Sequence, residues 1–301
     1  MYDKILVPLD GSKFAEVALY YAEGLAGNLG SKLTLVYVSD PNDYTSPNMY
    51  EGYLREAVKR AKANAEQVAA RRGGGEIEVD YKILHGYPAD EIVDYADKAN
   101  IDLIVLSPQG KSGEKRWDLG GVANRIMRTT RRQVFLARAK GFEPEVHKGK
   151  LEKVLVPVDG SKESESPVKY VEYMAAKLGL EVTLLHVFIS ESSSLIWSRE
   201  SAEKYRRLLK SSEAYIKKLT ERLKAEGLKV NPIFKEIEVG DVAEEIIKIS
   251  EEGDYSLVAM ATHGRSGVGR WIFGSNANKV LNYGSTPLLL VRPTKRKRPS
   301  K

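Results

Sequence analysis

Two hydrophobic patterns alternate along the chain. Short apolar runs such as Ile5–Leu9 and Leu33–Val38 contain β-branched residues and are apolar on both faces, which is typical of buried parallel strands. Longer amphipathic segments separate these runs. The segment after the first run places its apolar residues, from Ala15 to Ala26, on one helical face, and Ser12 stands where a helix N-cap is expected.

The same alternation continues through the first half of the chain. It predicts helices at 54–72, 89–99 and 122–131 and strands at 79–84, 103–106 and 134–137. Strands that alternate with helices predict the α/β class, with a doubly wound parallel sheet of five strands covered on both faces. Such sheets bind ligands beyond the carboxyl ends of their strands, where the strand order reverses. The residues after the first and fourth strands are therefore the candidate site.

The second half of the chain repeats the first. KILVPLDGSK at 4–13 returns as KVLVPVDGSK at 153–162, with eight of ten positions identical. Farther on, QVFLAR at 133–138 aligns with PLLLVR at 287–292. Because the order of the repeated segments is kept, the sequence predicts a duplicated domain rather than isolated similarities.

The repeat sets the expected domain organisation. We expect an N-terminal domain at 1–139, a linker at 140–150, a C-terminal domain at 151–293 and a basic tail at 294–301. The two domains are expected to pack as an internal pseudo-dimer through their last strands, and two chains to pair as a homodimer.

Composition narrows the class of protein. The 301 residues are 42% hydrophobic and 29% charged, as in ordinary globular proteins, and there is no cysteine for disulfide, iron–sulfur or thiolate chemistry. There is no apolar run of membrane length and no signal-peptide pattern, so we expect a cytoplasmic protein without a membrane partner. Most of the net charge of +6 lies in the tail, so nucleic acid is an unlikely partner. The four histidines have no ligand spacing, and no metal site is expected.

A glycine-rich segment follows the fourth strand of the second copy. Residues 260–275 read MATHGRSGVGRWIFGS, and a helix is predicted at 276–282. Glycines allow backbone N–H groups to approach a ligand closely, and a helix N-terminus adds free donors and a positive dipole end. Arg265 and Arg270 can reach phosphate oxygens. This pattern indicates an anion site, although a plain connecting turn is the alternative. The tyrosine-rich stretch at 44–53 is expected to form a covering loop.

These residues together resemble a tandem universal stress protein. ATP-binding members of that family carry G-x-x-G, nine residues and G-[ST] after the fourth strand; here the run is Ala261-Thr262-His263-Gly264, nine residues, Gly274-Ser275. The VPVDGS end of the first strand and His186-Val187 at the end of the second also match. The resemblance implies a Rossmann-like fold of the adenine nucleotide alpha hydrolase-like type and an ATP-binding stress-response or regulatory protein.

The resemblance also implies which residues of the second domain form the site. Asp159 would lie by the adenine and ribose, the Val187 backbone at the adenine edge, and Gly274 and Ser275 at the β- and γ-phosphates. Mg²⁺ can accompany ATP, and AMP or ADP are alternative ligands. Ala261 departs from the motif, which lowers affinity if a positive φ is needed there, and His263 is given a loop-orienting rather than catalytic role. The implied cofactor-binding residues are Pro157, Val158, Asp159, Val187, Ala261, His263, Gly264, Arg265, Gly267, Gly274 and Ser275.

The first domain departs further from the motif. Its run is Ser107-Pro108-Gln109-Gly110, nine residues, Gly120-Gly121, so that Pro108 removes one N–H and the serine hydroxyl is lost. We expect a weakened or empty site, in which the strand-end residues still fit adenosine. Its residues are Pro8, Asp10, Val38, Ser107, Gly110, Gly120 and Gly121.

Two other functions stay open at this point. One is a slow ATPase or an autophosphorylating enzyme, although no general base is placed for fast hydrolysis. The other is an interaction scaffold that binds no nucleotide. Loss of nucleotide binding on substitution of Asp159 and Gly264 would separate both nucleotide functions from the scaffold.

Overall fold

A computed structural model describes residues 1–40, 47–110, 119–138, 150–190, 199–238, 240–264 and 273–293. The expected linker, apart from Lys150, and the expected basic tail lie outside these residues. The strands of the first half are β1 Lys4–Pro8, β2 Lys32–Ser39, β3 Val79–His85, β4 Leu103–Leu106 and β5 Gln133–Leu136; its helices are α1 Lys13–Leu29, α2 Pro47–Ala70, α3 Pro88–Lys98 and α4 Gly121–Thr129.

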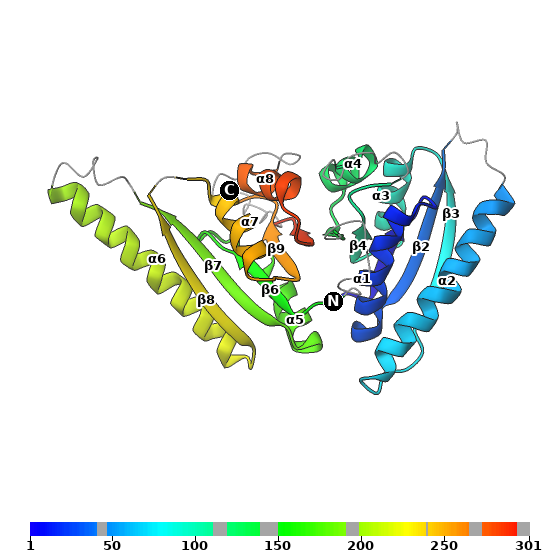
Figure 1. Cartoon of the computed structure of the whole chain (residues 1–301), viewed down its shortest axis with the longest axis horizontal. Helices are drawn as coiled ribbons and strands as arrows, with labels where there is room; N and C mark the ends of the chain where they lie inside the picture. Colours follow the sequence, from blue (N-terminus) through cyan, green and yellow to red (C-terminus); the bar gives the residue numbers. More distant parts are fainter. Residues whose placement is uncertain are drawn as a thin grey trace, which may run out of the picture.

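The second half repeats this order of elements. Its strands are β6 Lys153–Pro157, β7 Glu181–Ile189, β8 Lys229–Ile237, β9 Leu257–Ala261 and β10 Leu288–Val291; its helices are α5 Val168–Leu178, α6 Arg199–Ala225, α7 Val242–Glu252 and α8 Ser275–Tyr283. The long helices α2 and α6 lie toward opposite ends of the molecule (Figure 1).

The ten strands form one sheet in the order β3-β2-β1-β4-β5-β10-β9-β6-β7-β8. Within each half the described pairings are parallel, and β1 pairs with both β2 and β4, as β6 does with β7 and β9. The strand order therefore reverses beside β1 and beside β6. The doubly wound α/β fold predicted from the sequence is confirmed, and the predicted site segments follow the two strands that flank each reversal.

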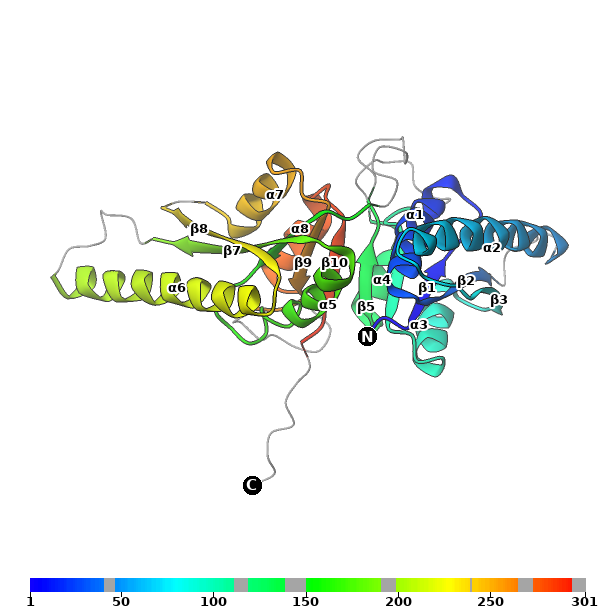
Figure 2. The same cartoon turned by 90° about the horizontal axis from the view of Figure 1, so that it is seen from below.

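The last strands of the two halves join them. β5 and β10 pair antiparallel at the centre of the molecule (Figure 2), with Phe135 opposite Leu289. These two residues are equivalent positions of the repeat, 154 residues apart. The pseudo-twofold axis that relates the halves therefore passes through this pair, as expected for an internal pseudo-dimer.

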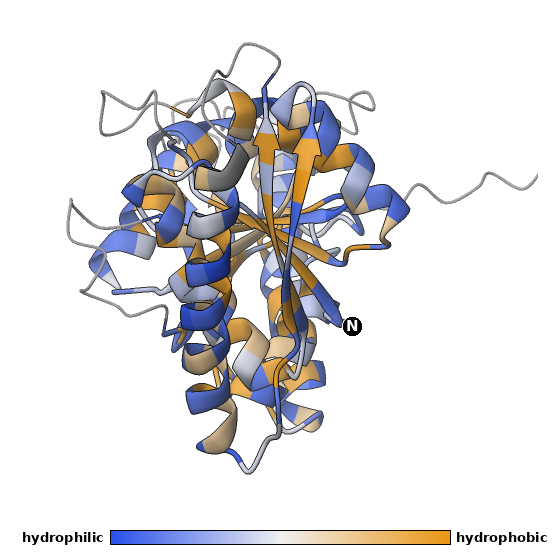
Figure 3. Cartoon of the chain, turned by 90° about the vertical axis from the view of Figure 1, so that its right-hand side faces the viewer, coloured by the Kyte–Doolittle hydropathy of each residue, from blue (hydrophilic) through white to orange (hydrophobic). Residues whose placement is uncertain are grey.

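Apolar residues cover both faces of the sheet. Helices α1, α2, α5 and α6 contribute to one buried cluster, and α3, α4, α7 and α8 contribute to the other. Each cluster contains residues of both halves, so the halves share their core. Figure 3 shows the strands largely hydrophobic, while the helices carry hydrophobic and hydrophilic residues on different faces.

Local sequence signals explain where the first helices start. The Ser12 hydroxyl accepts a hydrogen bond from the backbone N–H of Ala15 and so caps α1, as predicted. In the second half α5 begins later, after Pro167, because proline disfavours helical geometry in the residue before it. The expectation of a loop at 44–53 is wrong for its described part. Tyr50 lies on α2, where its ring stacks on Tyr37 at 4.0 Å between centroids.

Candidate functional site

The second half has a pocket beyond the carboxyl ends of β6 and β9. It is a cavity of about 270 Å³, bounded by the first residues of α8 and by part of α7. Its walls combine apolar side chains with backbone groups of the two strand ends. It is lined by Pro157, Val158, Asp159, Ser164, Leu185, Val187, Val242, Ile246, Met260, Ala261, Thr262, His263, Gly264, Gly274, Ser275, Asn276 and Ala277.

Asp159 is held in a defined orientation by the turn that follows β6. Its Oδ1 accepts hydrogen bonds from the Ser161 N–H at 2.9 Å and the Ser161 hydroxyl at 2.5 Å. Its backbone N–H donates to the Ser164 hydroxyl at 3.1 Å. The other carboxylate oxygen lies against Gly264, where an added Cβ would be 2.5 Å from Oδ2. The glycine at 264 is therefore needed for close approach of the β9 loop to the Asp159 turn.

Helix α8 begins at the same pocket. The Gly274 N–H donates to the Thr262 carbonyl at 2.9 Å, which ties the start of the helix to the end of β9. The N-cap residue of this helix is Gly274, which has no side chain to cap it, and the first-turn N–H groups of Ser275, Asn276 and Ala277 have no intrahelical partner. These donors and the positive end of the helix dipole favour an anion in the pocket.

The backbone of Ala261 is unstrained. Among the described non-glycine residues, only Asn100 and Asp254 have positive φ. Ala261 is the last residue of β9, so its methyl group requires no unusual conformation. The replacement of glycine at this position therefore adds a methyl group to the pocket wall without backbone strain.

Two histidines contact the strand ends that line the pocket. His263 Nδ1 lies 2.8 Å from the Thr262 hydroxyl, and His186 Nδ1 lies 2.9 Å from the Val158 carbonyl. The His186 ring is buried and stacks on Phe234 at 5.7 Å between centroids. The Tyr215 ring meets His186 edge-on, and burial, followed by the charge of Glu165, raises the pKa of Tyr215, which keeps this phenol neutral. These contacts orient the strand ends.

The structure brings most of the predicted second-domain residues together. Every one of them lines this pocket except Arg265 and Gly267, which lie outside the described residues. Sequence reasoning missed the apolar floor from β7, α7 and β9, of which Leu185, Ile246 and Met260 are members. The alternation along the strands and the helical period of α7 mark these residues as buried, but not as pocket-lining.

The first half contains an equivalent pocket of about 430 Å³. Its walls include all seven predicted first-domain residues: Pro8, Asp10, Val38, Ser107, Gly110, Gly120 and Gly121. The Gly120 N–H donates to the Pro108 carbonyl at 2.8 Å, as Gly274 does in the second half. A Cβ at Gly110 would overlap Asp10 Oδ2. The backbone frame of the two pockets is thus the same. The residues by which the first half departs from the motif do not fill its pocket.

The chemistry of the two pockets differs. In the first half the described lining includes two carboxylates, Asp10 and Asp40, whereas Asp159 is the carboxylate in the described lining of the second. Val122 stands where the second pocket has Asn276, and Gly121 where it has Ser275. The first pocket is therefore more apolar at the start of its helix and has one more carboxylate near its strand ends.

Comparison with known proteins assigns the family. The model of the universal stress protein family matches residues 1–138 and again 150–292. The chain belongs to the universal stress protein family. A universal stress protein of Synechocystis is 26% identical over 318 residues, which cover 96% of this chain and 99% of that protein. One of Methanocaldococcus jannaschii is 29% identical over 144 residues, 46% of this chain and 83% of that protein.

Solved structures support the same fold for this universal stress protein. The crystal structure of a universal stress protein from Archaeoglobus fulgidus covers 97% of this chain at a TM-score of 0.67 and 19% identity, with 99% of that chain covered. The full-length matches agree with the tandem arrangement. In the described part of the chain, no helix has the length and apolar character needed to cross a membrane. The described His, Asp and Glu side chains form no group of three that would hold a metal ion.

Proposed function

We propose that this universal stress protein is an adenine-nucleotide-binding regulatory protein that holds ATP mainly in its second half. The observation that carries the proposal is the meeting of the Asp159 carboxylate, Gly264 and the uncapped start of α8 around one cavity. A carboxylate suits ribose hydroxyls, and free N–H groups at a helix start suit phosphates. One pocket therefore offers suitable partners to both ends of a nucleotide.

The ligand would lie across the strand ends. The adenine packs against the apolar floor beside Val187, with Asp159 at the ribose. The phosphates follow Ala261 and Gly264 toward Gly274 and Ser275, and Mg²⁺ accompanies them. ADP or AMP would use the same frame with fewer contacts at α8.

The first pocket suits a different part of the same ligand. Its strand-end residues match those of the second half, but its two carboxylates and its apolar helix start oppose phosphate. We infer that it accepts adenosine better than ATP. This would leave one triphosphate site in each chain.

Fast hydrolysis is not expected from the described site. A general base must be within hydrogen-bond reach of the attacking water. The Oδ1 atom of Asp159 is engaged by Ser161, and His263 Nδ1 by Thr262. A slow ATPase or an autophosphorylating enzyme is the second candidate, and a nucleotide-free scaffold is the third.

Titration of ATP into two matched variants tests the proposal. Asp159→Ala and Asp10→Ala remove the same turn hydrogen bond, to Ser161 N–H in one half and to Ser12 N–H in the other. We expect Asp159→Ala to weaken ATP binding at least about tenfold, which corresponds to 1.4 kcal/mol, and Asp10→Ala to leave it nearly unchanged. The reverse pattern would place the site in the first half. If the wild type does not bind ATP at millimolar concentration with Mg²⁺, the nucleotide-free scaffold would be the remaining candidate function.

A further inference from the structure

A buried arginine crosses from the first half into the second. Arg138 follows β5 and is 9% exposed. Its Nη1 donates to the Thr286 carbonyl at 3.0 Å, and Nη1 and Nη2 both lie within 3.4 Å of the Val280 carbonyl. Nη2 also donates to the Leu281 carbonyl. The guanidinium of the first half thus binds two carbonyls in the last turn of α8, of which that of Val280 also accepts from the Gly284 N–H, and the Thr286 carbonyl just after the helix.

This contact reaches the proposed phosphate site through a short helix. α8 has nine residues, so Arg138 at its end and the pocket at its start are about 12 Å apart along the axis. Because the helix is short and continuously hydrogen-bonded, we expect a shift of its last turn to move its first turn as well. Its first residues lie at the pocket, and its last carbonyls have Arg138 as a partner.

A glycine makes room for the arginine. At Gly284 an added Cβ would lie 2.9 Å from the Val280 carbonyl oxygen and 3.3 Å from Arg138 Nη1. Its φ of −73° is open to any residue, so the glycine serves close approach rather than conformation. The equivalent position of the first half is Thr130, 154 residues earlier.

The repeat contains a reciprocal contact. Arg292, the equivalent of Arg138, donates from Nη2 to the carbonyls of Met127 at 3.0 Å and Arg128 at 2.5 Å. These carbonyls are at the end of α4, whose first residues line the first pocket. Each half therefore supplies an arginine to the pocket helix of the other. Arg292 is more exposed than Arg138, so the contact made by Arg138 is the more deeply buried of the two.

We propose that Arg138 is a positioning residue for the phosphate-binding end of the opposite half. This inference rests on the proposed ATP site. A positive group at the end of a helix satisfies its last carbonyls and complements its dipole. Without the guanidinium, the buried carbonyls of Val280, Leu281 and Thr286 lose a donor, and the helix relaxes away from the Asp159 turn. Phosphate contacts are lost, whereas adenosine contacts at the strand ends are kept.

Measured affinities for ATP and for adenosine distinguish a role of Arg138 in positioning the phosphate-binding end of α8 from a general contribution to the stability of the second half. We expect Arg138→Met to weaken ATP binding by the second half about tenfold and to change adenosine binding less than twofold. The ATP affinity of Arg138→Lys, whose side chain has fewer hydrogen-bond donors, should lie between the affinities of Arg138→Met and the wild type. Arg292→Met is the matched control and should leave ATP binding by the second half within about twofold. An unchanged ATP affinity in Arg138→Met, or an equal loss for both ligands, overturns the inference.

The wild-type chain provides a test that needs no variant. ATP should slow amide hydrogen exchange both in the last turn of α8 and at the end of β5, and adenosine should slow neither. Protection confined to the start of α8 would contradict the role of Arg138. If the wild type binds no ATP at all, the proposed function fails first, and this result is distinct from a wild type that binds ATP without the cross-protection.

Discussion

Gly264 and the Asp159 carboxylate approach each other closely in the second pocket. The distance of 2.5 Å from an added Cβ to Asp159 Oδ2 means that the carboxylate must move if any side chain is placed at 264. Gly274 differs, because its nearest neighbour would be the Thr262 carbonyl oxygen at 3.6 Å. Close approach therefore explains the glycine at 264 but not the glycine at 274.

The difference predicts unequal effects of the same substitution on stability. Gly264→Ala should lower the melting temperature by several degrees, since it displaces a hydrogen-bonded carboxylate. Gly274→Ala, at a φ of −60°, should change the free energy of unfolding by no more than about 0.5 kcal/mol. Thermal unfolding followed by circular dichroism checks both. Equal melting temperatures would show that Asp159 relaxes freely.

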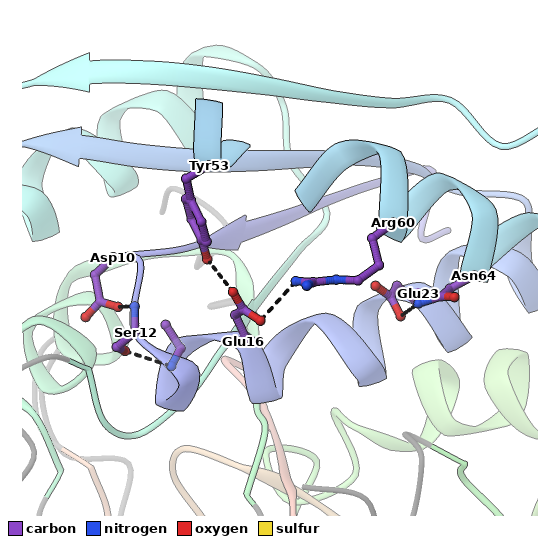
Figure 4. Close-up of polar contacts among 8 residues, drawn as sticks. Asp10, Ser12, Glu16, Glu23, Tyr53, Arg60 and Asn64 are labelled. Carbon is purple, nitrogen blue, oxygen red and sulfur yellow. Dashed lines mark hydrogen bonds and ion pairs between the residues drawn. The ribbon is translucent and has the colours of Figure 1, made fainter. Parts of the chain in front are cut away.

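Glu23 is a buried acid outside the site. It lies on α1, accepts a hydrogen bond from the Asn64 side chain of α2 at 2.9 Å, and is 5% exposed (Figure 4). Burial raises the pKa of Glu23 to about 7, and the Asn64 hydrogen bond and the charge of Arg60 offset part of this increase. Arg60 itself pairs with Glu16 at 2.9 Å.

This raised pKa predicts that stability falls as the pH rises. The folded state binds the proton more tightly than the unfolded state, whose carboxyl titrates near 4.5. The stabilising contribution is complete below pH 4.5 and is lost as the pH rises through about 7, an effect on the order of 3 kcal/mol. Glu23→Gln should be more stable than the wild type at pH 8 and should lack this part of the pH dependence. Urea unfolding at pH 5 and pH 8 measures the difference, and parallel pH profiles of the two proteins would contradict it.

At the scale of elements, helix starts and strand ends determine the site. α1 has a side-chain cap at Ser12, whereas the N-cap residues of α4 and α8, whose starts line the pockets, are glycines and provide none. The capped helix supports the Asp10 turn, and the uncapped helices keep their N–H donors available for a ligand. The difference follows from the residue at the N-cap, which is serine in α1 and glycine in α4 and α8.

Removal of the α1 cap is expected to lower the free energy of unfolding. Ser12→Ala should lower the free energy of unfolding by about 1 kcal/mol, because the Ala15 N–H loses its acceptor. Ser12→Thr keeps an acceptor and serves as the control. Denaturant unfolding of the three proteins under one condition measures both changes. A Thr variant as unstable as the Ala variant would show that the hydroxyl contact is not responsible.

The sequence predicted most elements, because the strands are buried runs and the repeat supplied each pattern twice. It predicted Asp159 and Gly264 at one site because both follow strands at the order reversal. It did not predict the helical position of Tyr50, since periodicity is ambiguous beside a stretch of sequence rich in Pro, Asn and Ser. It also could not predict the Arg138 contact or the burial of Glu23. Both depend on how segments distant in the sequence pack together, which no local pattern encodes.

At the scale of the whole molecule, the halves share one sheet and both of its cores. Phe135 is fully buried at the pseudo-twofold axis, and its ring lies 5.2 Å from that of Tyr21. Across the junction Tyr2 contacts Tyr170 and Tyr173, both at 6.1 Å between centroids. A sheet and core continuous across the junction predict that the two halves unfold together.

Phe135→Ala tests this continuity. It should lower the free energy of unfolding by about 3–5 kcal/mol and should destabilise both halves within one calorimetric transition. Tyr87→Ala, at a side chain that is 65% exposed, is the control and should change stability by less than about 0.5 kcal/mol. Two separate transitions in the wild type, or loss of only one half in Phe135→Ala, would contradict a shared core.

The number of triphosphates bound by each chain tests the central claim most directly. Equilibrium dialysis of the purified protein against saturating ATP and Mg²⁺, followed by chromatography of the nucleotide released on denaturation, gives this number. We predict one ATP for each chain, lost in Asp159→Ala and kept in Asp10→Ala. Two for each chain would contradict the assignment of ATP to the second half, and none would contradict nucleotide binding itself.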